Sequence, residues 1–463
     1  MPKVSAAAYR CEECGNEVAK WVGRCPECQA WGSIGEVGVK PGQHVTSGPV
    51  SAPARPIAQI AADGAAHRPT GIDELDRVLG GGLVPGSVVL LAGEPGVGKS
   101  TLLVSAAARI ANGGRRCLVV TGEESAAQVR LRAGRVGALA DELYLAAETD
   151  LSAVLGHLDQ VRPDVLVVDS VQTIGSAAAE GTPGGVTQVR EVAGALSRVA
   201  KERGIATVLV GHVTKDGAIA GPRLLEHLVD VVLHFEGDRH SRLRLVRTVK
   251  NRFGPADEVG CFDLTDDGIV GLTDPSGLFL SRSDNPVPGT CVTVAMEGRR
   301  PMVTEVQALV AKTALPAARR ATSGLDSARF AMILAVLERR TGHHLNQMDV
   351  YAATVGGVRL VEPAADLALA LATAGASTDK TLPADLVAIG EIGLAGEVRP
   401  VSAVGARLQE AARLGFTSAL VPPGCASRVA GIHVREVSDL HAALRSLTRS
   451  TGGADVVRLE TVL

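Results

Sequence analysis

The stretch Gly93-Glu-Pro-Gly-Val-Gly-Lys-Ser100 decides the fold, because it matches the phosphate-binding pattern GxxxxGK(S/T) in full. It follows the apolar run SVVLLA at 87–92 and precedes the segment TLLVSAAARIA at 101–111. A strand, a glycine-rich loop and a helix in this order are the context that the pattern requires. Backbone N–H groups of such a loop surround phosphates, and the helix N-terminus adds positive potential. The sequence therefore predicts a nucleotide-binding loop, and a chance glycine turn is the weaker interpretation.

Two residues of this loop have specific expected roles. Lys99 is expected to hold the β- and γ-phosphates of ATP, and Ser100 to bind Mg²⁺. The full set of expected nucleotide contacts is Gly93, Glu94, Pro95, Gly96, Val97, Gly98, Lys99, Ser100 and Thr101.

Apolar runs and helical segments alternate after Thr70. The runs RCLVVTGEE, DVLVVDS and IATVLVGHV are continuous rather than alternating, which favours an α/β fold with a parallel sheet covered on both faces. Between Arg242 and Asp263 two runs, RLRLVRTVK and EVGCFDL, follow each other without a helix. They predict an antiparallel edge. The region after 273 adds the strands TCVTVAMEG and PMVTEVQALV and the helices SARFAMILAVLERR and AADLALALATA.

Acidic residues end two of these strands. Asp169 closes the run DVLVVD seventy residues after Lys99, a position typical of a Walker-B carboxylate. Glu123 follows the run CLVVT, and in a parallel sheet its carboxylate points into the same crevice, where it can orient the attacking water. Glu124 is the second candidate for this base. Alternatively, both acids only cap the helix that starts near Ser125.

Downstream residues add further candidates. His212 ends another strand and is able to sense the γ-phosphate, although a lone histidine is more often an ordinary loop residue. The string Lys250-Asn251-Arg252-Phe253-Gly254 follows an antiparallel strand. It is either a solvated turn or a cationic finger that reaches DNA or the nucleotide of a neighbouring subunit.

Four of the eight cysteines follow the pattern Cys11-x2-Cys14-x10-Cys25-x2-Cys28. Two CxxC knuckles supply the four thiolates of a closed, structural Zn²⁺ site. A redox pair would need a thioredoxin-like βαβ context, which is missing here. We expect Trp21 and Trp31 to pack over this small core rather than to stack on a base.

Composition narrows the classes of protein. The chain has 463 residues, 46% of them hydrophobic and 21% charged, which excludes global disorder. Its 47 basic and 50 acidic residues give a net charge of −3, so it is no uniformly basic nucleic-acid binder. Four scattered cysteines, the lack of an apolar run of about eighteen residues and the lack of a signal sequence predict a cytoplasmic protein without a membrane partner.

Taken in order, these motifs resemble the RadA (Sms) family of bacterial DNA-repair proteins, relatives of the RecA recombinase. The resemblance covers essentially the whole chain, and KNRFG at 250–254 is its most diagnostic string. It implies a C4 zinc finger (1–35), a flexible linker (36–66), a RecA-like P-loop ATPase core (67–272) and an α+β Lon-protease-like domain (273–463).

The resemblance also implies roles. Lys99, Glu123, Asp169, Lys250 and Arg252 become catalytic candidates, and the segments Gly175–Val189 and Thr214–Arg223 fall where relatives bind DNA. The DNA-contact candidates are Lys215, Arg223, Lys250, Asn251, Arg252, Phe253, Gly254, Arg319 and Arg320, although Arg319 and Arg320 are equally consistent with a plain exposed pair of charges.

In the Lon-like region, Ala364 stands where the nucleophilic serine is expected, and Gly405 where its lysine is expected. Without a nucleophile or its base, this region cannot form an acyl-enzyme intermediate. The resemblance therefore implies a DNA-dependent ATPase that forms a hexameric ring on single-stranded and branched DNA and promotes branch migration with RecA. A nucleotide-gated signalling module and an ATP-dependent protease are the alternatives.

Overall fold

The computed structural model describes residues 9–36, 54–59, 66–212, 222–237, 242–281, 286–313 and 317–448. The chain divides into two compact units, residues 1–62 and 63–463. The domain boundaries expected near 35, 66 and 272 stay predictions.

The N-terminal unit is a three-stranded antiparallel sheet. Strands β1 (Tyr9–Cys11), β2 (Glu17–Val18) and β3 (Ile34–Glu36) pair in the order β2-β1-β3. Its buried core consists of two cysteines and Ile34. A 3₁₀ turn, η1 (Ile57–Gln59), belongs to the same unit. So few apolar side chains cannot stabilise a fold alone, which is why metal binding is expected to supply the rest.

The second unit contains a nine-stranded sheet in the order β12-β11-β10-β9-β4-β8-β7-β5-β6. Its six parallel strands are β4 (Val88–Gly93), β5 (Cys117–Thr121), β6 (Leu143–Ala147), β7 (Val165–Asp169), β8 (Ala206–His212) and β9 (Val231–Gly237). The predicted parallel sheet is therefore confirmed.

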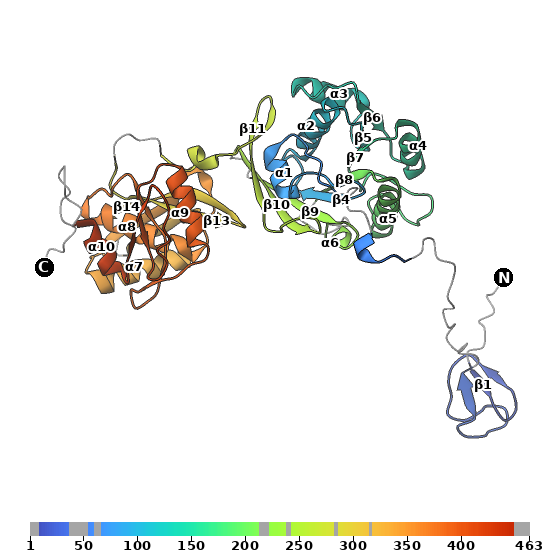
Figure 1. The fold of residues 1–463 in the computed structure, drawn as a ribbon. Helices are drawn as coiled ribbons and strands as arrows, with labels where there is room; N and C mark the ends of the chain where they lie inside the picture. Colours follow the sequence, from blue (N-terminus) through green and yellow to red (C-terminus); the bar gives the residue numbers. More distant parts are fainter. Residues whose placement is uncertain are drawn as a thin grey trace. The chain divides into compact units, whose positions relative to one another are not determined.

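Helices cover both faces of this sheet (Figure 1). One face packs against α1 (Asp73–Leu79) and α2 (Lys99–Asn112), with α3 (Ala126–Arg135) beyond α2. The other packs against α4 (Leu151–Val161), α5 (Val186–Arg203) and α6 (Pro222–Leu225). Within the described ranges, no helix is long and apolar enough to span a membrane.

The predicted antiparallel edge is also confirmed. Strands β10 (Leu243–Asn251), β11 (Val259–Thr265) and β12 (Gly268–Gly271) extend the sheet from β9 by antiparallel pairing. We call these three strands the ribbon. The end of the Ile269 side chain in the ribbon lies where a Cβ at position 98 would stand, so Gly98 and Ile269 pack closely. The ribbon therefore backs the phosphate loop.

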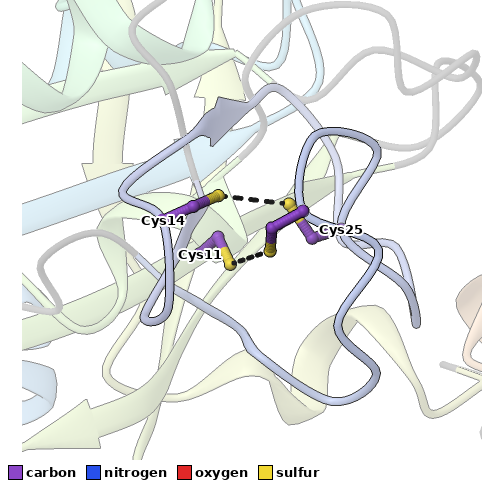
Figure 2. A group of neighbouring side chains, drawn as sticks. Cys11, Cys14 and Cys25 are labelled. Carbon is purple, nitrogen blue, oxygen red and sulfur yellow. Dashed lines mark hydrogen bonds between the residues drawn. The ribbon is translucent and has the colours of Figure 1, made fainter.

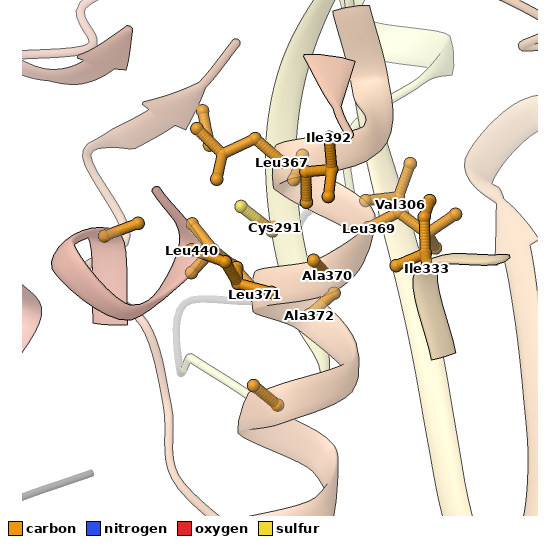
Figure 3. Close-up of a cluster of buried hydrophobic side chains, with 14 of the residues drawn as sticks. Cys291, Val306, Ile333, Leu367, Leu369, Ala370, Leu371, Ala372, Ile392 and Leu440 are labelled. Atoms are coloured by element: carbon orange, nitrogen blue, oxygen red, sulfur yellow. The ribbon is translucent and has the colours of Figure 1, made fainter. Parts of the chain in front are cut away.

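A second, seven-stranded sheet follows in the order β15-β16-β14-β13-β17-β20-β21. Its strands are β13 (Thr290–Glu297), β14 (Arg300–Lys312), β15 (Arg320–Ser323), β16 (Met348–Thr354), β17 (Leu386–Ala388), β20 (Ser418–Val421) and β21 (His433–Glu436), and β18 (Glu391–Ile392) pairs separately with β19 (Val398–Arg399). The helix α8 (Asp366–Thr378) lies at the centre of its main core, as Figure 3 shows.

Three further helices complete this part of the fold. Helices α7 (Ser327–Thr341) and α10 (Leu440–Thr448) join α8 in the main core, whereas α9 (Val404–Arg413) packs into a second apolar cluster. Short 3₁₀ turns are η3 (Pro275–Leu278), η4 (Val355–Gly357) and η5 (Pro363–Ala365).

A buried ion pair joins helix α1, which covers the nine-stranded sheet, to strand β14 of the seven-stranded sheet. The guanidinium of Arg300 at the start of β14 contacts the carboxylate of Glu74 in α1, and the side chains are only 6% and 1% exposed. Arg300 also donates to the carbonyls of Leu272 (3.2 Å) and Thr273 (2.9 Å), and the amide of Cys261 donates to Glu74 (2.8 Å). Every group of this pair thus has a partner, as a buried charge requires.

We predict that Arg300→Ala destabilises the protein by about 3–5 kcal/mol, because it leaves the Glu74 carboxylate buried without its cation. The matched control is Arg299→Ala, since Arg299 is exposed and 3.6 Å from Glu258; it should cost less than about 1 kcal/mol. Urea unfolding of the full chain followed by circular dichroism measures both. Equal midpoints for the two variants would contradict the prediction.

Candidate functional site

The phosphate loop connects β4 to α2 at the carboxyl end of the sheet. β4 ends at Gly93, and α2 begins at Lys99, two residues before the segment expected from the sequence. Gly96 (φ 80°) and Gly98 (φ 111°) adopt backbone conformations that favour glycine. The loop therefore needs glycine at both positions to bend into the helix.

Lys99 lies beneath this loop and is only 3% exposed. Its ammonium donates to the carbonyls of Gly93 (2.9 Å) and Glu94 (2.8 Å). Burial lowers the pKa of Lys99 to about 8, while Asp169 and Glu123 act in the opposite direction. Because burial disfavours the charged form of Lys99, a phosphate close to its ammonium should stabilise that form strongly.

Asp169 stands at the end of β7, and its carboxylate accepts a hydrogen bond from Ser100. Burial raises the pKa of Asp169, and the Ser100 hydroxyl and His212 partly offset this. A hydroxyl beside a carboxylate is an oxygen donor set that suits Mg²⁺. Ser100 and Asp169 are therefore the residues here that fit the expected ion.

Glu123 lies close enough to Asp169 for its charge to raise the pKa of that carboxyl group. The hydroxyl of Ser170 donates to its Oε1 (2.8 Å), and Nε2 of His212 lies 3.2 Å from the same oxygen. The side chain of Glu123 is 46% exposed, so water can reach it. Ser170 belongs to none of the sequence motifs that predict site residues, although it follows Asp169 directly.

Glu124 behaves differently from its neighbour. Its carboxylate contacts Arg132 of α3 rather than Ser170 or His212. The helix α3 is capped by Ser125 in a capping box with Gln128. The alternative that Glu123 and Glu124 only cap this helix is therefore wrong.

The basic string 250–254 lies at the other end of the sheet. Asn251 pairs with Val231 at the start of β9, and Val231 pairs with Val89 near the start of β4. Lys250 and Arg252 therefore lie at the amino edge of the parallel strands, opposite the phosphate loop of their own chain.

Both cations of this string have partners within the chain. Lys250 donates to the carbonyls of Glu226 (2.7 Å) and Val229 (2.9 Å), and Arg252 donates to Asp230 (2.9 Å). The side chain of Asn251 donates to Leu79 (3.2 Å), Gly254 packs against Gly80, and Phe253 is 37% exposed. The string is therefore an ordered turn, and its Arg252 side chain is still 54% exposed to solvent.

The other DNA-contact candidates are scattered. Arg320 donates to the carbonyls of Leu345 (2.6 Å) and Met348, and Arg319 begins the same exposed segment. Lys215 lies outside the described residues, as does most of Thr214–Arg223, and only the backbone of Arg223 is described. In the segment Gly175–Val189, the Gln188 amide donates to the carbonyl of Ala179 (2.6 Å) and orders the loop.

The four cysteines of the N-terminal unit converge, as Figure 2 shows for Cys11, Cys14 and Cys25. Their four sulfur atoms lie within 4.8 Å of one another, and the pairs Cys11–Cys28 and Cys14–Cys25 are each 3.6 Å apart. A tetrahedral site with Zn–S bonds of about 2.3 Å has sulfurs about 3.8 Å apart. The hydroxyl of Ser33 lies 3.2 Å from Cys11 and lowers the pKa of that thiol to about 6. The thiols are thus arranged for a metal and not for a disulfide.

The expectation for the two tryptophans is wrong. Trp21 is 62% exposed and Trp31 is 77% exposed, and both rings lie beside Gly23 rather than over the core. The guanidinium of Arg24 stands 5.8 Å from the centre of the Trp31 ring.

Comparison with known proteins gives consistent matches. A family model described as an AAA domain matches residues 54–218, and one described as a rubredoxin metal binding domain matches 9–36. The chain is 57% identical over 449 residues to the DNA repair protein RadA of Mycolicibacterium smegmatis, which covers 95% of this chain and 96% of that protein. It is 45% identical over 419 residues to the protein of the same name from Halalkalibacterium halodurans (89% and 92%).

We predict that affinity for ATP falls as the pH rises above about 8. Lys99 loses its proton in this range, because burial lowers its pKa to about 8. A bound triphosphate raises that pKa, so binding takes up a proton and weakens by up to about tenfold per pH unit. Below the free pKa this contribution is fully present. Titration with a fluorescent ATP analogue between pH 7 and 9.5 measures the slope, and Lys99→Met should lack it. A wild-type affinity that is flat up to pH 9.5 would contradict the prediction.

Proposed function

The chain belongs to the RadA family of DNA repair proteins, and from this premise we propose that it is a DNA-dependent ATPase that drives movement on single-stranded DNA. In this proposal it forms a ring of six copies in the cytoplasm and promotes branch migration of recombination intermediates together with RecA. The observation that carries the proposal is the proximity of Lys99, Asp169 and Glu123, whose charges act on one another.

Each of these side chains has a distinct task in hydrolysis. Lys99 exchanges two backbone carbonyls for phosphate oxygens and offsets the charge that develops on them. Ser100 and Asp169 would hold Mg²⁺, which neutralises phosphate charge. Glu123, fixed by Ser170, orients the attacking water and accepts its proton.

The same cluster offers a route from hydrolysis to DNA. His212 touches Glu123 and is the last residue of β8. The segment Thr214–Arg223 begins two residues after His212 in the sequence, so we propose that a change at the γ-phosphate reaches this segment along the chain. We propose this segment and Gly175–Val189 as DNA-binding loops, with Arg319 and Arg320 as further phosphate contacts.

Lys250 and Arg252 have two candidate roles. Their position at the amino edge excludes direct contact with the ATP of their own chain. It supports contact with DNA or with the ATP of a neighbouring subunit, where a cation stabilises the transferred phosphoryl charge.

The structure argues against one alternative function, an ATP-dependent protease, and an experiment tests the other, a nucleotide-gated interaction module. An ATP-dependent protease lacks support, because Ala364 is buried in an apolar cluster with Val404 and neither it nor Gly405 carries a reactive group. A nucleotide-gated interaction module would hydrolyse ATP independently of DNA.

We predict that single-stranded DNA stimulates ATP turnover and that Glu123→Gln lowers the stimulated kcat by about 10²–10⁴-fold with little change in KM, because the base is lost and nucleotide contacts remain. Glu124→Gln is the matched control and should keep most activity, since Glu124 contacts Arg132 instead. Steady-state turnover with and without DNA at two salt concentrations measures this. Equal rates with and without DNA would contradict the proposed function, and equal rates for the two variants would contradict the assignment of the base.

A mixing experiment distinguishes the two candidate roles of Lys250 and Arg252 in the basic string. The double variant Lys250→Ala/Arg252→Ala keeps Glu123, and the variant Glu123→Gln keeps Lys250 and Arg252. If the basic string acts on the ATP of a neighbouring subunit, mixing the two variants should restore turnover. If it acts on DNA alone, the double variant by itself should keep its DNA-free turnover and lose stimulation. Wild-type turnover and stimulation in the double variant would remove both roles.

A further inference from the structure

A buried arginine of the ribbon touches the phosphate loop from behind. Arg244 on β10 is only 5% exposed, and its Nε donates to the carbonyl of Val97 (3.1 Å). The two residues are 147 positions apart in the chain. From the sequence, Arg244 is only part of the strand run RLRLVRTVK and has no expected role.

The fold makes room for this side chain. Arg244 pairs across the strands with Gly237 of β9, and a Cβ at position 237 would collide with the Arg244 side chain. The guanidinium therefore crosses over a glycine to reach the loop. Its Nη1 also donates to the carbonyl of Leu243 (2.9 Å), which fixes its orientation.

The hydrogen bond from Arg244 to the Val97 carbonyl sets the direction of the Gly98 N–H, which belongs to the same peptide group. In a trans peptide the C=O and the N–H point in opposite directions. Because the Val97 carbonyl points outward to Arg244, the N–H of Gly98 points toward the inner side of the loop, where phosphate-binding amides converge. Gly98 has φ 111° and lies against Ile269, so the ribbon holds this peptide from two strands.

We propose that Arg244 is a positioning residue of the nucleotide site, which orients the Val97–Gly98 peptide so that its N–H donates to a phosphate oxygen of a nucleoside triphosphate. The proposal rests on the proposed nucleotide site but not on its coupling to DNA. Arg244 acts through the backbone and through its charge behind the loop, without touching the nucleotide.

The test compares Arg244→Met, Arg244→Lys and the control Arg242→Met in the full chain. Arg242 precedes β10 and pairs on the surface with Asp263 at 2.7 Å, so its loss should change affinity by less than about twofold. The probe is ATP labelled with N-methylanthraniloyl, in the presence of Mg²⁺. Arg244→Met should weaken its binding roughly ten- to a hundredfold, the range for a hydrogen bond involving a charged group. Arg244→Lys should recover most of the affinity, because an ammonium can still donate to the Val97 carbonyl.

Hydrogen exchange separates positioning from a purely structural role. In Arg244→Met, the peptide covering residues 93–101 should lose the protection that a saturating ATP analogue gives it, while β4 stays protected. If Arg244→Met does not fold, Arg244→Lys should show a smaller loss confined to the same peptide. A folded Arg244→Met that binds labelled ATP within twofold of Arg242→Met overturns the proposal, as does an Arg244→Lys with unchanged exchange when it alone folds. ATP turnover without DNA stimulation would contradict the proposed function and leave this test intact.

Discussion

The burial of one ammonium group beneath a glycine-rich turn is the constraint on which the site depends. The ammonium of Lys99 donates to two carbonyls of the phosphate loop, so the loop and the lysine hold each other in position. The lowered pKa expresses the cost of this arrangement. A phosphate removes that cost, which is why the geometry favours a polyanionic ligand over a neutral one.

The ribbon extends this constraint to the rest of the second unit. On one side it supports the loop through Arg244 and Ile269. On the other, its last strand leads into carbonyls at Leu272 and Thr273 that accept from Arg300. One antiparallel element therefore contacts both the phosphate loop and the first residue of β14, so a displacement at either end is resisted by buried polar contacts.

Local signals in the sequence were enough for much of the site. The phosphate loop and Asp169 were predictable because a strand, its terminal residue and the following turn are contiguous in the chain. The roles of Glu123 and Glu124 separated only in the structure, since Ser170 and Arg132 come from other elements. The burial of Arg244 was not predictable from local pattern. The alternation in RLRLV favours Leu243 and Leu245 as the buried face, yet Arg244 is buried because Gly237 opposite makes room.

The placement of Lys250 and Arg252 bears on how copies of the chain could cooperate. Asp230, which holds Arg252 at 2.9 Å, also accepts the amide of Val88 at the first residue of β4 (3.1 Å). The other end of β4 is Gly93, so a single strand of about 20 Å separates the basic string from the phosphate loop. If each string faces the crevice of the next copy, the contact is head to tail, and head-to-tail contacts close into rings when the rotation permits. Arg252 would then have to leave a carboxylate that is only 5% exposed, which is favourable only where phosphate charge replaces it. A cation used this way would respond to the charge of the neighbouring nucleotide, so the state of one crevice would influence the amino edge of the next strand β4.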